Sequence, residues 1–156
     1  VTTTNCSNNY GPFQHSEKLI PTVIRSCIEH KSIPIYGNGS NIRDWLYVRD
    51  HCVGIDAVIR NGRLGECYNI GGLNEWTNVD ICRLICQLMD ELSPPPGKSK
   101  IKSHQELITF VKDRAGHDWR YAIDATKIAN ELDWKPIETF ETGIRQTVKW
   151  CVEKSI

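Results

Sequence analysis

Short strand-like runs alternate with helical repeats along this chain, and this alternation constrains its fold more than any other feature. Between Lys18 and His30, apolar residues recur every three or four positions, which is the spacing of one helix face. The run Ile33–Tyr36 follows as a short strand, closed by a glycine turn at 37–39. Strands that alternate with helices are typical of α/β proteins with parallel sheets. The sequence therefore predicts an α/β fold.

The other elements are predicted by the same patterns. Strands are expected at 1–6, 44–48, 66–70 and 108–111, and helices at 50–61, 77–92, 124–132 and 140–152. A turn is expected at 7–12, and the proline-rich segment 93–99 is interpreted as a surface linker.

Helix caps and core positions follow from residue type. Asp50 and Asp124 are placed as N-caps, and Thr77 with Asp80 forms a capping-box pattern. Within the strand at 44–48, we interpret three residues as sheet core, namely Trp45, Leu46 and Val48.

Length and charge bound the class of protein. The chain has 156 residues, enough for one domain with a real core, and 19 basic residues balance 19 acidic ones. Without a basic excess we expect no nucleic-acid partner, and without a run of about 18 apolar residues we expect no membrane span. The start at Val1 has neither a methionine nor a signal-peptide pattern, so we expect the chain to begin within a longer protein.

The seven cysteines are scattered, and no pair has the C-x-x-C spacing of a metal or redox site. Cys82 and Cys86 lie one helical turn apart, where a ligand pair and two core residues are both conceivable. Their apolar neighbours Ile85 and Met89 favour the core. We therefore expect no metal, and a reducing, cytoplasmic location.

The usual catalytic motifs are missing. Gly37 and Gly39 begin a G-x-G-x-x-G pattern, but position 42 is Ile42, so a plain turn is favoured over a dinucleotide fingerprint. None of the five tyrosines is followed by a lysine four residues later, and no G-x-S-x-G or H-E-x-x-H occurs. We assign no catalytic residue to this chain.

Polar residues gather instead in the predicted turns at strand ends, where open α/β sheets bind ligands. Arginine offers a planar fork for phosphate oxygens, tyrosine a face for stacking on a base, and asparagine a donor and an acceptor. For Arg43 the alternative is an ordinary surface ion pair. His51 and His30 are interpreted as a helix start and an exposed helix end.

Taken in order, several segments carry a resemblance to a known family. They are "TTTNCSNNYGP", "EKLIP", "IPIYGNGSNIRDWLYVRDH", "GECYNIGG", "NEWTN", "DRAGHDWRYAID", "ELDWKP" and "TFETGIRQTVKW". Together they resemble the C-terminal half of the dTDP-glucose 4,6-dehydratases, in the extended short-chain dehydrogenase/reductase family. The likeness runs from Thr2 to Trp150 and weakens only between Pro94 and Lys102.

The resemblance implies a division of the chain. Residues 1–156 would be a single C-terminal region, with late Rossmann strands and a small substrate-binding α/β domain. Segments 1–12 and about 44–72 would complete the Rossmann domain. Segments about 13–43 and 73–156 would form the substrate-binding domain. A homodimer would form through the Rossmann half.

The resemblance also implies site residues. Arg43 and Asn78 would hold a diphosphate, with Arg114 as a second phosphate arginine. Substrate contacts are expected at Asn8, Lys18, Leu19, Pro34, Ile35, Tyr36, Arg43, Asn78, Asp113, Arg114, Ala115, Gly116 and His117, and a contact to the nicotinamide end of NAD at Asn9. Ser16 and Ala115 replace prolines that are usual in the family, which loosens two binding loops.

The implied function is the nucleotide-sugar-binding half of a dTDP-glucose 4,6-dehydratase. The full enzyme would oxidise the sugar at C4 with NAD, eliminate water across C5 and C6, and return the hydride to C6, with its catalytic residues upstream of this chain. Two alternatives stay open: part of a GDP- or UDP-sugar dehydratase or epimerase, and a non-catalytic module that binds a sugar nucleotide or a partner.

Overall fold

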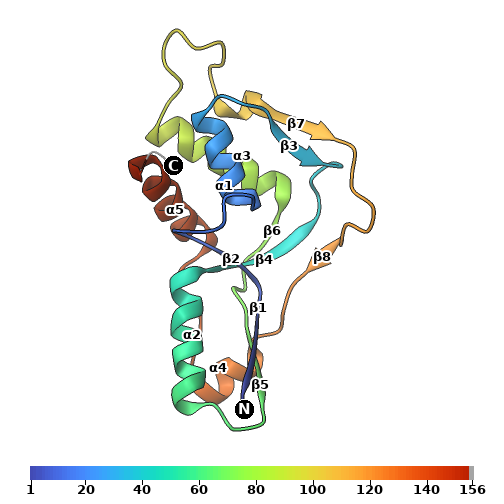
Figure 1. The fold of residues 1–156 in the computed structure, drawn as a ribbon, viewed down its shortest axis with the longest axis vertical. Helices are drawn as coiled ribbons and strands as arrows, with labels where there is room; N and C mark the ends of the chain where they lie inside the picture. The colour runs from blue at the N-terminus through green and yellow to red at the C-terminus, as the bar shows by residue number, and fades with distance from the viewer. Residues whose placement is uncertain (155–156) are drawn as a thin grey trace.

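The computed structural model describes residues 1–154, which form two packed units, one above the other in Figure 1. In chain order the elements are β1 (Thr3–Cys6), β2 (Asn8–Tyr10), α1 (Leu19–Ile28), β3 (Ile33–Tyr36), β4 (Ile42–Tyr47), α2 (Val48–Asn61), β5 (Cys67–Ile70), β6 (Glu75–Thr77), α3 (Asn78–Leu92), a 3₁₀ turn (His104–Leu107), β7 (Ile108–Val111), β8 (Arg120–Tyr121), α4 (Thr126–Leu132) and α5 (Phe140–Lys154). Helices and mostly parallel strands confirm the predicted α/β class.

The strands pair in three small sheets. β1 pairs with β5, and β3 pairs with β7, both in parallel. β4 is the centre of the largest sheet, because it pairs in parallel with β2 and β8 and antiparallel with β6. Since β2 and β8 are remote in sequence, β4 brings distant polar segments to one place.

Each unit has its own hydrophobic core. The first core consists of Tyr10, Ile20, Val23, Ile24, Cys27, Ile33, Ile35, Trp45, Tyr47, Ile81, Cys82, Ile85, Cys86, Leu88, Met89, Leu107, Phe140, Ile144, Val148 and Cys151. The second core consists of Leu46, Val58, Tyr68, Ile70, Ala125, Ile128 and Trp134. Successive side chains of a strand point to opposite faces, so in β4 Trp45 and Tyr47 enter the first core while Leu46 enters the second.

Asp44 ties β4 to the segment that follows β5. Its buried carboxylate accepts hydrogen bonds from the backbone N–H groups of Gly72, at 2.9 Å, and Asn74, at 2.8 Å. The Asn74 side-chain oxygen in turn accepts from the backbone N–H of Phe140, at the start of α5. One buried acid thus sets the path between the two cores.

The expected domain division stays a prediction. The packing of the second core shows which segments lie together in the lower unit. Residues 1–12 and 44–72 contain β1, β5 and α2, which pack in the lower unit of Figure 1. Helix α4 and Trp134 pack with them in the second core, although the division places 125–134 in the other domain. The lower unit therefore includes a return segment that sequence reasoning assigned elsewhere.

The helices bear out the periodicity. In α3 the expected inner face is largely buried, and the prediction that Cys82 and Cys86 are core residues is confirmed. The Thr77 cap is also confirmed, since its hydroxyl oxygen accepts from the backbone N–H of Asp80 at 3.2 Å. No helix within residues 1–154 is both long and apolar enough to cross a bilayer.

Two predicted caps differ from the structure. The expectation that Asp50 is an N-cap is wrong, because α2 begins at Val48 directly from β4, which also removes Val48 from the sheet. The buried Asp50 carboxylate instead accepts from the backbone N–H groups of Ile137, at 3.1 Å, and Glu138, at 2.9 Å. Asp124 lies just outside α4, yet its carboxylate accepts from the N–H of Thr126, the first helical residue.

Several short strands were not expected. The predicted turn at 7–12 is wrong in part, because Asn8–Tyr10 is strand β2. β6 and β8 were missed altogether. The strand expected at 44–48 begins earlier, at Ile42, so Arg43 lies within the strand and not ahead of it.

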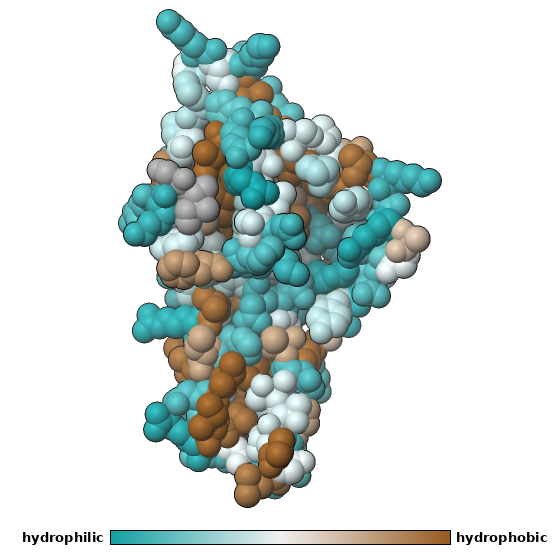
Figure 2. Space-filling model, viewed as in Figure 1, coloured by the Kyte–Doolittle hydropathy of each residue, from teal (hydrophilic) through white to brown (hydrophobic). Residues whose placement is uncertain are grey.

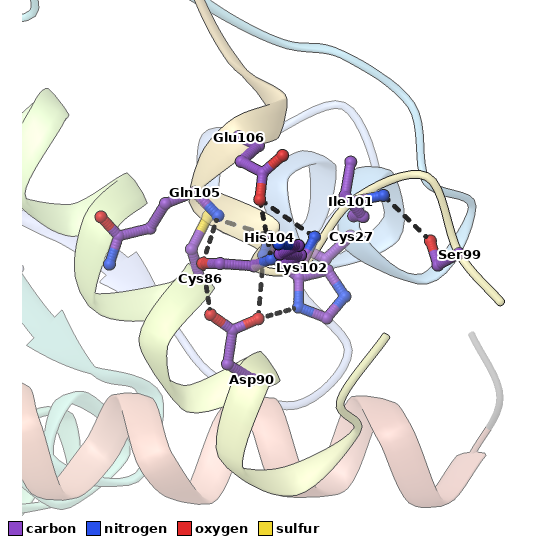
Figure 3. Close-up of polar contacts among 10 residues, drawn as sticks. Cys27, Cys86, Asp90, Ser99, Ile101, Lys102, His104, Gln105 and Glu106 are labelled. Carbon is purple, nitrogen blue, oxygen red and sulfur yellow. Dashed lines mark hydrogen bonds and ion pairs between the residues drawn. The ribbon is translucent and has the colours of Figure 1, made fainter. Parts of the chain in front are cut away.

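A partly buried acid–histidine contact anchors the end of the segment after α3 (Figure 3). The Asp90 carboxylate accepts from the hydroxyl of Ser103, at 2.6 Å, and from the backbone N–H of His104, at 2.8 Å, and lies 2.5 Å from His104 Nδ1. Burial opposes ionisation of Asp90, but these hydrogen bonds outweigh it and hold its pKa below the usual range. The contact pins the 3₁₀ turn to α3.

We predict that Asp90→Asn lowers the free energy of unfolding at pH 7 by about 1.5–3 kcal/mol, since hydrogen bonds to a charged acceptor are lost. The pKa of Asp90 is lower in the folded chain than in the unfolded chain, where it is about 4, so the ionised carboxylate stabilises the fold above pH 4. This stabilisation is lost as the pH falls through the pKa of the folded state. In urea unfolding, the difference in free energy of unfolding between the wild type and Asp90→Asn should therefore become smaller below pH 4. Asp56→Asn, on the exposed face of α2, is the control and should change stability by less than about 0.5 kcal/mol. Equal effects of the two variants would contradict the anchoring role.

Candidate functional site

A cavity of about 790 Å³ opens between the first core and the loops around it, a size typical of small-molecule sites. Segments far apart in the sequence form its wall, from β2, the loop before α1, α1, β3, β4, α3 and the loop before β8. The lining residues are Asn8, Asn9, Gln14, His15, Glu17, Lys18, Leu19, Thr22, Val23, Ile33, Pro34, Ile35, Tyr36, Arg43, Trp45, Asn78, Cys82, Arg114 and His117.

Arg43 is the central charge of this cavity. Its side chain is on the same face of β4 as Trp45, and the residue is only 9% exposed. The guanidinium donates to two backbone carbonyls, of Ile42 at 2.7 Å and Asp118 at 3.0 Å. Within residues 1–154 it forms no ion pair, and it is buried, so the surface ion-pair alternative does not hold. A buried guanidinium that only neutral carbonyls partner is suited to an anion that enters the cavity.

Most of the other charges around the cavity have the same sign. Lys18 and Arg114 add two further cations to its wall, against the single carboxylate of Glu17. Asn78 is the first residue of α3, a helix of 15 residues, so the positive end of that helix dipole also lies at the wall. The cavity therefore favours an anionic ligand.

One side of the cavity mouth carries an aromatic ring and a histidine. Tyr36, at the end of β3, is 49% exposed and meets the His117 ring edge-on, with the ring centroids 6.5 Å apart. The His117 side chain is 5% exposed, and its Nδ1 lies 2.8 Å from the Asp113 carboxylate. That contact holds the pKa of Asp113 below its usual range. Tyr36 thus leaves a ring face open beside a fixed imidazole.

Most of the expected contact residues meet in this one cavity. Those that line it are Asn8, Asn9, Lys18, Leu19, Pro34, Ile35, Tyr36, Arg43, Asn78, Arg114 and His117. Asp113, Ala115 and Gly116 do not line it, because their loop presents only Arg114 and His117 to the cavity. The ligand contacts themselves stay predictions.

Sequence reasoning missed part of the wall, although the periodicities contained a signal. Trp45 follows Arg43 by two residues in a strand, and Cys82 follows Asn78 by four in a helix, so each pair shares a face. Thr22 stands in the same relation to Lys18. The other missed residues are Gln14, His15, Glu17, Val23 and Ile33. For Gln14 and His15, in an irregular loop, no such signal exists.

The wall beside β2 has an unused acceptor. The Asn9 amide nitrogen donates to the Ser7 carbonyl at 3.1 Å, whereas its Oδ1 is buried without a partner in the described part of the chain. Gln14 lies next to it and donates to the Asn9 backbone carbonyl at 2.7 Å. An amide N–H of a bound group would satisfy Asn9, which fits the carboxamide of a nicotinamide.

The cavity offers no activated nucleophile. Burial, with a smaller effect of neighbouring Cys86, raises the pKa of the Cys82 thiol to about 12, so it is protonated at neutral pH. Burial likewise raises the pKa of Tyr10, which lies in the first core. Among residues 1–154, no three histidine, cysteine or acidic side chains are grouped to hold a metal. The arrangement can bind and orient a ligand.

We predict that thiol reagents will separate the cysteines by burial. At pH 7.5 exposed Cys52 and Cys67 should react fast in the folded chain, while Cys82 should react only as the protein unfolds. Mass spectrometry after timed labelling measures this, and Cys52→Ser and Cys67→Ser serve as controls. Fast labelling of Cys82 would contradict its burial in the cavity wall.

Comparison with known proteins places the chain among nucleotide-sugar enzymes. A family model described as GDP-mannose 4,6 dehydratase matches residues 1–147. The probable dTDP-glucose 4,6-dehydratase of Sinorhizobium fredii is 56% identical over 153 residues, which are 98% of this chain and 42% of that protein. The chain therefore spans about two fifths of the length of this curated relative.

Solved structures agree with this. The dTDP-glucose 4,6-dehydratase of Bacillus anthracis, solved in complex with NAD, superposes with a TM-score of 0.84 at 49% identity, over 99% of this chain and 45% of that one. The dTDP-glucose 4,6-dehydratase of Streptomyces venezuelae, solved with NAD and TYD bound, superposes with a TM-score of 0.84 at 40% identity. This match covers 97% of this chain and 44% of that one. The fold is thus that of a portion of these enzymes.

Proposed function

Because the chain belongs to the GDP-mannose 4,6-dehydratase family, we propose that it is the nucleotide-sugar-binding part of a dTDP-glucose 4,6-dehydratase. The names of its relatives support the dTDP-sugar assignment. The observation that carries the proposal is Arg43, a buried guanidinium without an ion pair in residues 1–154, in a cavity that it shares with Arg114 and Lys18.

In this proposal each part of the wall meets one part of the ligand. Arg43 and Arg114 hold the diphosphate, and Asn78 adds a hydrogen bond at the positive end of α3. Tyr36 offers its exposed ring face to the base. The carbonyl and amide groups of Asn8 reach the sugar end, because Asn8 is level with Trp45, two residues beyond Arg43 on β4.

The chemistry of the dehydration belongs to residues outside this chain in our proposal. The chain lacks the glycine fingerprint of a dinucleotide site and a Tyr-x-x-x-Lys pair. Burial raises the pKa of the Cys82 thiol, which lies in the cavity wall, to about 12. NAD, when bound, supplies the acceptor and donor for the hydride. We expect Asn9 of this chain to contact it, through the Oδ1 that has no hydrogen-bond partner within residues 1–154. Alone, the chain should bind the substrate without turnover.

The rest of such a protein would complete the lower unit. Hydrophobic side chains are exposed there in Figure 2, and Val53, Ile59 and Leu64 are among the exposed apolar residues of α2 and the loop after it. We propose that β1, β5 and α2 belong to the Rossmann domain. A homodimer through that domain and a cytoplasmic location stay part of the proposal, and the seven free cysteines support a reducing compartment.

We predict that Arg43→Ala weakens dTDP binding by about 1.5–3 kcal/mol, measured by calorimetry, because a charged hydrogen bond to phosphate is lost. The affinity of Arg43→Lys for dTDP should lie between those of the wild type and Arg43→Ala, since lysine keeps the charge but lacks the planar guanidinium. Arg49→Ala, an exposed arginine of α2 outside the cavity, is the matched control and should leave binding unchanged. Thermal unfolding checks that each variant is folded. An unchanged affinity of folded Arg43→Ala would return Arg43 to a structural role.

We further predict that dTDP binds more tightly than UDP or GDP in the same calorimeter. Tighter binding of UDP or GDP would favour the alternative of a related dehydratase or epimerase. With NAD and dTDP-glucose present, the chain alone should form no 4-keto-6-deoxy sugar. Turnover would contradict the proposal that the catalytic residues lie outside it.

A further inference from the structure

Asp113 and His117 form a pair at the mouth of the cavity, and only the histidine faces the cavity. Asp113 Oδ1 and His117 Nδ1 are 2.8 Å apart. The His117 side chain is almost wholly buried, whereas the Asp113 side chain is 45% exposed on the outer side of the loop. A contact role for Asp113 therefore does not follow from its position.

The carboxylate determines which ring nitrogen carries the proton. An ionised Asp113 only accepts hydrogen bonds, so Nδ1 of His117 must be the protonated nitrogen. The contact with His117 holds the pKa of Asp113 below its usual range, so Asp113 is ionised at neutral pH. In the neutral ring Nε2 is then an acceptor, and no hydrogen-bond partner for it exists within residues 1–154.

The aspartate is itself held in place from two sides. Its Oδ1 also accepts from the backbone N–H of Arg114, at 2.8 Å. Gly37, with φ +59°, lies against it, and a Cβ at that position would be 3.0 Å from Oδ2. Tyr36 meets the imidazole at an interplanar angle of 85° and limits rotation of the ring. Contacts from the end of β3 and from the loop itself thus fix the positions of Asp113 and His117.

We propose that Asp113 is a positioning residue, which fixes the His117 tautomer so that Nε2 accepts a hydrogen bond from a hydroxyl of the bound nucleotide. Asp113 does not touch the ligand. The phosphates need donors, which Arg43, Arg114 and Lys18 supply. An acceptor nitrogen beside Tyr36 in the same cavity is instead suited to a hydroxyl of the deoxyribose. The inference rests on the proposed function, because it takes a nucleoside diphosphate as the ligand.

A double-mutant cycle tests this with dTDP as the probe, in the full chain and by calorimetry. Asp113→Ala should weaken binding about three- to tenfold, the effect of one hydrogen bond. His117→Gln keeps a side-chain acceptor that needs no aspartate. In that background Asp113→Ala should change affinity by less than about twofold, since the two residues act as one unit. An equal loss in both backgrounds would overturn the inference. Asp56→Ala, an exposed acid of α2 outside the cavity, is the control and should leave dTDP binding unchanged.

Nitrogen NMR of the histidine rings gives an independent readout without ligand. His117, assigned by the loss of its signals in His117→Gln, should show a protonated Nδ1 and a bare Nε2, and Asp113→Ala should mix the tautomers. An unchanged tautomer in Asp113→Ala overturns the inference even if dTDP binds. Absence of dTDP binding to the wild-type chain, with Arg43 and Asp113 intact, would instead overturn the proposed function.

Discussion

Strand β4 belongs to both cores, and the rest of the structure depends on that double membership. Trp45 and Tyr47 pack in the first core and Leu46 in the second, so neither unit can shift along the strand without uncovering apolar side chains. The Asp44 carboxylate, on the same strand, accepts hydrogen bonds from the backbone N–H groups of Gly72 and Asn74, which follow β5. The face of β4 that carries Trp45 also carries Arg43, which places the charge at the edge of the first core.

This arrangement explains how Arg43 can be buried without a carboxylate partner among residues 1–154. Two carbonyls, one from its own strand and one from Asp118, orient the guanidinium and partly satisfy its donors. The remaining attraction for an anion is stronger at the edge of an apolar core than in water, because the local dielectric constant is lower. β2, β8 and α3 bring Asn8, the loop of Arg114 and His117, and Asn78 to the same place. The candidate site is thus a consequence of strand pairing.

The regular elements of this fold could be predicted from the sequence, because their periodicity records burial on one face. Helix α3 is the best example, with its Thr77 cap and its buried Cys82 and Cys86. Strands β2, β6 and β8 have only two or three residues each, and their pairing with β4 depends on partners that no local pattern reveals. Asp50 was misplaced for the same reason, since its partners, Ile137 and Glu138, are remote in the chain. For the site, the resemblance predicted a set of contact residues, while only the structure separates His117 on the cavity wall from Asp113 behind it.

A crystal structure of the chain with dTDP-glucose bound tests the central claim most directly. The account predicts the diphosphate between Arg43 and Arg114, next to Asn78, with the base against Tyr36. A ligand bound elsewhere, with the Arg43 guanidinium still bonded only to the carbonyls of Ile42 and Asp118, would contradict it.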